Sequence, residues 1–135
     1  MRFQYCFQKI VDLKTSEKTQ AEWVLSDAIG ILRREEGRLS ELHEIKEQLR
    51  EDLSQAATQR ARASEMQLLQ QYVNHLDLQI KRKKDEVDSA QESVDVRQHR
   101  LTASLLQEKV WLKAKEKAHQ QFTAESRKKR ADHAG

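Results

Sequence analysis

The chain has 135 residues, of which 35% are charged and 5% aromatic, with three glycines and no proline. Proline and glycine form turns and break helices, so this composition argues against a compact domain with many turns and favours a long helix or coiled coil. The net charge is only +3, from 25 basic and 22 acidic side chains that alternate along most of the chain, as on a solvated helix surface.

The first predicted element is a helix over about residues 3–57. From Leu25 to Ala56, the positions reached by alternating steps of three and four residues are apolar in eight of ten cases, and the exceptions are Glu35 and Lys46. This spacing is the a and d seam of a heptad repeat. Before residue 25 the register is looser, and a separate apolar stripe is expected to extend the helix with a shifted face: Phe3, Phe7, Ile10 and Leu13.

A turn is predicted at about residues 58–63. The segment from Ser54 to Ser64 contains no large apolar residue. Ser64, with Gln67 three residues later, has the spacing of a capping box that starts a new helix. One continuous helix through this segment is the alternative, because no glycine or proline marks a turn there.

The second predicted helix covers about residues 64–128. Its heptad seam runs from Met66 to Leu101, where nine of eleven positions are apolar and the exceptions are Lys83 and Arg97. The pattern fades after Phe122. A run of four basic residues then leads into a tail, residues 131–135, that is expected to be frayed because it has no apolar anchor.

Two seams of similar length predict an all-α fold, a long two-helix antiparallel coiled-coil hairpin forming a single domain over residues 1–135. Each helix would span about 80 Å at a rise of about 1.5 Å per residue. Folded back on each other, the helices pair residues whose numbers sum to about 120. We therefore predict a salt bridge between Glu35 and Lys83, whereas the alternative is that both side chains extend into water.

Motifs for catalysis are missing from the sequence. No phosphate-binding loop or dinucleotide fingerprint is present, and the five histidines and single cysteine have no zinc-ligand spacing. We therefore predict no enzymatic activity, no cofactor and no metal. Cys6 alone cannot form an intrachain disulfide, and no secretion signal or membrane-spanning run is apparent, which favours a cytoplasmic location.

The basic run Arg127–Arg130 has two interpretations. It can be a cation cluster that complements the dipole at a helix C-terminus. It can also dock on an acidic protein surface or on nucleic acid. No aromatic side chains alternate with these cations to stack on bases, so nucleic acid is not expected as a partner.

The first residues have a pattern known from one protein family. Phe3, Phe7, Gln8 and Lys9 stand in an F-x-x-x-F-Q-K-hydrophobic-x-x-L-K run that Glu17-Lys18 and Gln20 follow. This run strongly resembles the opening of the FliJ family. A second similar segment is residues 69–80, where an aromatic residue is followed four residues later by leucine and then by isoleucine. Residues between 111 and 125 also fit: Trp111, Lys113, Lys115, Glu116, Lys117, Phe122 and Glu125.

The resemblance implies a soluble component of the bacterial flagellar type III export apparatus, and with it a role in motility. FliJ proteins form an antiparallel coiled coil similar to the central stalk of rotary ATPases. The family's partners are the hexameric export ATPase, the cytoplasmic part of the membrane-embedded export gate, and export chaperones. The implied location is cytoplasmic, and peripheral at the inner membrane through these partners. Family members often carry a glycine in the hairpin loop, and some continue further at the C-terminus; this sequence has no glycine there and stops at Gly135.

The resemblance also implies two sets of contact residues. The end that carries both termini would lie near the ATPase ring, with these candidate residues: Phe3, Gln4, Phe7, Gln8, Lys9, Arg127, Lys128, Lys129 and Arg130. The candidates for the export gate lie toward the hairpin tip: Tyr72, Leu76, Gln79 and Lys83. Leu76 is a seam position, so core packing is the preferred interpretation of that residue.

Two alternative functions follow from the residues alone. A generic structural coiled coil would dimerise through its own seam, with both predicted helices on one continuous rod. A nucleic-acid-binding coiled coil would use the basic tail, and its binding would weaken steeply with salt.

Overall fold

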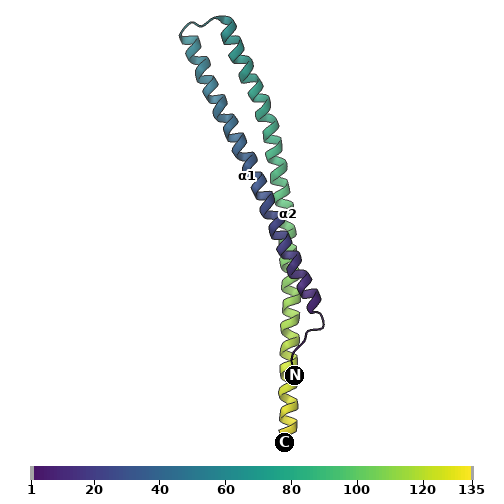
Figure 1. Ribbon diagram of the computed structural model, residues 1–135. Coiled ribbons are helices and arrows are strands. Elements are labelled where there is room, and N and C mark those ends of the chain that lie inside the picture. Colours follow the sequence, from purple (N-terminus) through teal and green to yellow (C-terminus); the bar gives the residue numbers. More distant parts are fainter. Residues whose placement is uncertain (1, 135) are drawn as a thin grey trace. The chain divides into compact units, whose positions relative to one another are not determined.

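The computed structural model describes residues 2–134 and contains two α-helices joined by a short connection (Figure 1). Helix α1 spans Gln8–Thr58, helix α2 spans Ala63–Ala134, and the described residues include no strand. The helices pack against each other as an antiparallel hairpin, which confirms the predicted fold class. Contacts divide the chain into two compact units. Unit 1 combines the described residues up to Ser26 with those from Val96 onward, and unit 2 is Asp27–Asp95.

The core of unit 2 lies along the predicted heptad seam. Its buried residues come from both helices: Ala28, Leu32, Val73, Leu76 and Ile80. Every other seam position in this unit is half-buried, including the charged residues Glu35 and Lys83. The side chains at alternating steps of three and four share one face of each helix, so the two apolar stripes cover each other.

Unit 1 continues the same seam with more polar side chains. Val11 and Leu25 are its buried residues. Between them, Lys14 and Lys18 occupy seam positions and are only 22% and 24% exposed. The predicted shifted stripe is wrong, because Leu13 is 54% exposed on the outer side. The heptad register does not shift, because Lys14 and Lys18 occupy the seam positions between Val11 and Leu25. A pattern of apolar residues does not detect these positions, since lysine is polar.

The turn between the helices uses a left-handed residue that is not glycine. Arg60 has a φ of 58°. The Ala61 amide donates to the Ala56 carbonyl at 2.9 Å, and the Arg60 amide donates to the Ala57 carbonyl at 3.4 Å. This pair of bonds is the Schellman arrangement that ends helices, usually with glycine at the left-handed position. A chain without glycine in this segment therefore still reverses direction, and the continuous helix is excluded.

The helix ends differ from the predicted ones in three places. Helix α1 begins at Gln8 rather than at Phe3. Helix α2 begins at Ala63, and the Arg62 carbonyl accepts from the amides of Glu65 and Met66, so Ser64 lies inside the first turn and is not its cap. Helix α2 also continues through Ala134, past residue 128, because no glycine or proline interrupts residues 123–134. Of the predicted tail, Gly135 lies outside the described residues.

Arg60 gives a direct test of the turn. Substitution Arg60→Gly removes the strain of a residue with a side chain in the left-handed region, which stabilises the folded state. This stabilisation exceeds the cost of the greater conformational entropy that glycine gives the unfolded chain. We expect the free energy of unfolding to rise by about 0.5–1 kcal/mol. The measurement is urea denaturation followed by far-UV circular dichroism.

The matched control is Gln59→Gly, one residue earlier, where the backbone does not have a positive φ. Glycine there should be neutral or destabilising, since it only adds freedom to the unfolded chain. The substitution Arg60→Ala separates the backbone effect from loss of the arginine side chain. A destabilised Arg60→Gly variant would contradict the left-handed turn.

Candidate docking surfaces

The segment before α1 packs against α2 through aromatic rings in unit 1. The Phe3 ring lies 4.7 Å from the His119 ring and 5.4 Å from the Phe122 ring, between centroids. Phe7 lies 5.9 Å from Trp111. Such pairs contribute about 0.5–1.5 kcal/mol each beyond their buried area. The start of the chain therefore leaves the helical path and is held on α2 (Figure 1).

A cavity of about 600 Å³ lies beside these rings, and we call its lining the N-terminal surface: Phe3, Gln4, Tyr5, Cys6, Gln8, Lys9 and Lys115. Four of the residues predicted to contact the ATPase line it together. Lys115 comes from α2 and adds a second cation to that of Lys9. Sequence analysis identified Lys115 only as part of the family pattern, because its position beside Lys9 depends on how the helices pair.

The basic run is exposed on α2. Phe122 is five residues before Arg127, which is about 7.5 Å along a helix. The ring contacts and the cavity lining of the N-terminal surface include none of Arg127–Arg130. The structure thus brings together the predicted N-terminal candidates and places the basic run farther along the same helix.

The candidates for the export gate separate into surface and core residues in unit 2. Tyr72 is 58% exposed and Gln79 is also exposed, whereas Leu76 is 4% exposed and packs in the core. Lys83 is half-buried. A groove of about 440 Å³ includes Gln79 and Lys83, and its full lining comes from both helices: Arg38, Glu41, Leu42, Ile45, Gln79, Arg82, Lys83 and Glu86. The α1 side of this groove is missing from the sequence prediction, since only helix pairing reveals it.

The predicted salt bridge is present at the edge of this groove. The Lys83 Nζ donates to Glu35 Oε2 at 2.8 Å and to Glu86 Oε2 at 2.5 Å. The hydrogen bond from Lys83 lowers the pKa of Glu35, against a smaller opposing effect of burial. The hydrogen bonds to Glu35 and then to Glu86 raise the pKa of Lys83. Both groups therefore stay ionised over a wider pH range than in the unfolded chain.

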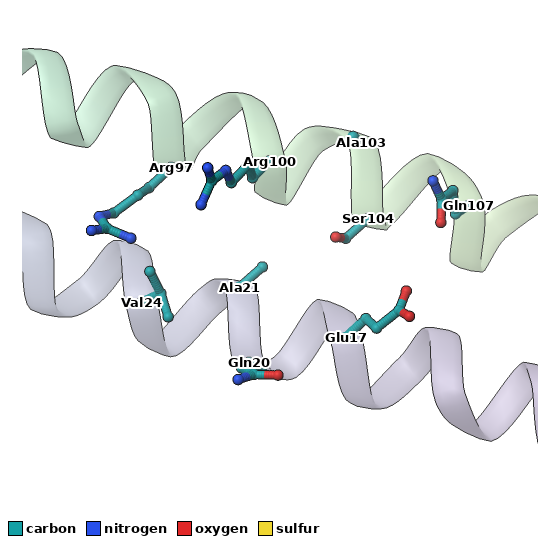
Figure 2. A pocket seen from close by; sticks show the side chains of 9 residues that line it. All are labelled: Glu17, Gln20, Ala21, Val24, Arg97, Arg100, Ala103, Ser104 and Gln107. Carbon is teal, nitrogen blue, oxygen red and sulfur yellow. The ribbon is translucent and has the colours of Figure 1, made fainter.

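Unit 1 contains a second interhelical groove, with a volume of about 470 Å³ (Figure 2). Three small side chains leave space between the helices there: Ala21, Ala103 and Ser104. Figure 2 shows Glu17 and Arg100 directed toward the space between the two helices.

Neither a metal-binding cluster nor a membrane-spanning helix occurs among the described residues. Across residues 2–134, no group of three or more histidine, cysteine or carboxylate side chains is arranged to hold a metal ion. In the same range, no helix combines the length and apolar content that crossing a bilayer requires.

Comparison with known proteins gives one match. The family model described as "Flagellar FliJ protein" matches residues 3–130, nearly the whole chain. No curated protein and no solved structure gives a significant match.

The Glu35–Lys83 pair predicts a pH dependence. A lowered folded pKa means that Glu35 contributes stability above its ordinary pKa, which is about 4.3, and that this contribution is lost as the pH falls through the lower folded value. Lys83 contributes below its ordinary pKa, about 10.4, and loses its contribution as the pH rises through its raised value. We expect Glu35→Gln to be less stable than the wild type at neutral pH, and the difference to shrink in acid.

Urea denaturation of both proteins at neutral pH and at about pH 3 measures this difference. The variant Glu44→Gln, at an exposed carboxylate of the same helix, controls for the loss of one negative charge. A stability difference between wild type and Glu35→Gln that is the same at both pH values would contradict the pairing.

The aromatic contacts predict a coupled effect of Phe3 and Phe122. Either alanine substitution should release the N-terminal segment and expose Trp111, with the detached population rising about two- to ten-fold. Acrylamide quenching of Trp111 fluorescence, in a Trp23→Phe background, reports this exposure. The double variant should quench little more than Phe3→Ala alone, because that substitution already removes the ring that Phe122 contacts.

The variant Leu68→Ala, in unit 2, is the control and should leave the quenching unchanged. If Phe3→Ala and Phe122→Ala also left it unchanged, the segment would not be held on α2 by these rings.

Proposed function

Because the chain belongs to the FliJ family of flagellar proteins, we propose that it acts as the stalk of the flagellar export ATPase. Family membership makes the chain a component of the flagellar protein-export apparatus. The proposal goes further: the chain binds the hexameric ATPase, promotes assembly of the ring and stimulates hydrolysis. It has no catalytic activity of its own and no cofactor in this proposal.

The N-terminal surface is the observation that carries the proposal. Residues 3–9 hold the most specific family pattern, yet they add little to the interhelical core. Phe3 instead contacts His119 and Phe122, and Lys9 and Lys115 line one cavity with two glutamines. Side chains held in place before binding lose less entropy when a partner docks. A positive, pre-organised surface suits a ring lined with acidic groups.

Arg127–Arg130 are a second part of the proposed ATPase surface. These cations are exposed and lie at the C-terminal end of α2, where the helix dipole already favours positive charge. They would strengthen long-range attraction to an acidic ring rather than form the specific contact. Exposed charges at the edge of an interface act mainly on the association rate and on its salt dependence.

The proposal includes a separate contact with the export gate. Tyr72 and Gln79 are exposed side chains on one face of α2 in unit 2, and Gln79 shares its groove with Ile45 of α1. Aromatic residues are enriched at the centres of protein interfaces, and Tyr72 suits that role. Lys83 would position the groove edge through its bond to Glu35. Leu76 would act through the core that supports the groove.

Binding of export chaperones and a peripheral position at the cytoplasmic face of the inner membrane complete the proposal. The chain would reach the membrane only through its partners. Membership of the FliJ family is what supports both parts.

The test is ATP hydrolysis by the cognate flagellar export ATPase, titrated with this protein while ring assembly is followed by light scattering. Wild-type protein should stimulate hydrolysis and increase the hexamer fraction. Lys9→Glu combined with Lys115→Glu should need at least about ten-fold more protein for half-maximal stimulation, because it reverses charge inside the proposed contact. Deleting residues 1–10 should abolish stimulation.

The matched control reverses two exposed lysines of α2 in unit 2, as Lys81→Glu with Lys84→Glu, and should stimulate like the wild type. Circular dichroism verifies that every variant is helical. A folded wild-type protein that neither binds nor stimulates the ATPase would refute the stalk role. Equal weakening by both lysine pairs would mean that only net charge matters, and the N-terminal surface would lose its assigned role.

A further inference from the structure

The seam of unit 1 is more polar than the seam of unit 2. Of the described residues in unit 1, Val11 and Leu25 are the buried hydrophobic ones, whereas unit 2 has five. The α1 positions between these two are lysine, lysine and alanine. On α2 the seam of unit 1 includes four half-buried polar residues: Arg97, Ser104, Glu108 and Lys115. Closing unit 1 therefore removes less apolar surface from water than closing unit 2 does.

Polar contacts take the place of apolar packing along this part of the seam. The Lys14 Nζ donates to Gln107 Oε1 at 2.9 Å, and the Lys18 Nζ lies 3.5 Å from Glu108 Oε2. Next to them, small side chains such as Ala21 line the groove of about 470 Å³ instead of filling it. Polar groups exchange such partners for water when two helices separate, so these contacts oppose separation only weakly.

Aromatic rings close unit 1 at the start of the chain. Phe3 contacts the rings of His119 and Phe122, and Phe7 contacts Trp111. We call the two ring contacts of Phe3 the latch. The latch joins the segment before α1 to α2, and the polar seam positions follow it along the chain. Separation of the helices at those positions is therefore opposed mainly by the rings and by the two buried residues of unit 1.

We propose that unit 1 is a clamp that opens while unit 2 stays closed, and that the latch holds it shut. Proteins open locally where packing is weakest, at a lower free energy than global unfolding. In the open state the part of α1 from Gln8 to Leu25 leaves α2, and the buried residues of unit 2 keep their contacts. A partner that draws Phe3 off α2 would release the latch and increase the open population. This device is independent of the stalk role.

The test measures labelling of a buried cysteine by a thiol reagent in the folded, full-length protein, with Cys6→Ser as the background. Val11→Cys and Leu25→Cys probe unit 1, and Val73→Cys and Leu32→Cys probe unit 2. The two valines are 4% and 5% exposed and the two leucines are 8% and 9% exposed, so each pair is matched in residue type and burial. The reagent reaches these positions only when the helices part, so the labelling rate reports the open population.

We expect the two cysteines of unit 1 to be labelled at similar rates, each at least about ten-fold faster than its matched cysteine in unit 2. Hydrogen exchange of the unsubstituted protein makes the same comparison without any cysteine variant. Amides of residues 11–25 should exchange at least about ten-fold faster than those of residues 28–49, because a detached helix end of this length frays in water.

Further substitutions test the latch and the polar seam separately. Phe3→Ala should raise labelling of both unit 1 cysteines about two- to ten-fold and leave the unit 2 cysteines unchanged. Lys18→Leu with Glu108→Leu replaces the half-buried ion pair by an apolar pair and should slow labelling in unit 1 at least about five-fold. The control, Lys81→Leu with Asp85→Leu, makes the same change at exposed positions of unit 2 and should alter every rate by less than about two-fold.

Four outcomes would overturn the proposal. Equal labelling of all four cysteines would mean that the hairpin opens only as a whole. Fast labelling of Val11→Cys with slow labelling of Leu25→Cys would mean that only the end of α1 frays. Unchanged unit 1 rates in Phe3→Ala would remove the latch, and unchanged rates with the leucine pair would remove the polar seam as the cause. Circular dichroism verifies that each variant is helical. The ATPase takes no part in these measurements, so failure here is distinguishable from failure of the stalk role.

Discussion

Two helices can bury only the stripe along which they touch, and this constraint governs the whole chain. A residue on that line determines stability and register, and a residue off it faces solvent or a partner. In unit 2 the line is mainly aliphatic, and Leu32, Leu76 and Ile80 are buried there. The described residues contain no buried polar or charged side chain. With so narrow a core, most side chains off the seam face solvent.

Charged residues on the seam define the register. Aliphatic side chains tolerate sliding by a heptad, because each leucine meets another leucine after the slide. Glu35 and Lys83, and in unit 1 Lys18 and Glu108, pair across the interface only in one alignment. Shifting the helices would leave these charges partly buried without partners, which costs much more than losing an exposed ion pair. The seam is thus less stable than an all-leucine one would be and more specific.

The two surfaces proposed to bind partners result from the same division. Unit 1 holds the first residues of the chain against α2 through Phe3, His119 and Phe122. That contact holds the segment before α1 in place, so that its side chains line one cavity together with Lys9 and Lys115. In unit 2, Gln79 of α2 lines a groove to which α1 contributes Ile45.

The sequence by itself determined the helical class, the heptad seam and the salt bridge. All ten seam positions from Leu25 to Ala56 and all eleven from Met66 to Leu101 are buried or half-buried. The Glu35–Lys83 pair could be predicted because antiparallel pairing makes residue numbers sum to a constant. The sequence also determined the family, through the pattern that begins at Phe3. Periodicity reports these features because it depends only on which side chains share a helix face.

Only the tertiary structure decided what depends on contacts between distant residues. It placed Lys14 and Lys18 on the seam, where their polarity conceals them from an apolar pattern. It reversed the chain at Arg60, a left-handed position that sequence signals assign to glycine. It placed Phe3 before the start of α1, in contact with the rings of His119 and Phe122. It also completed the two candidate surfaces, since Lys115 and Ile45 become neighbours of the predicted residues only after the helices pair.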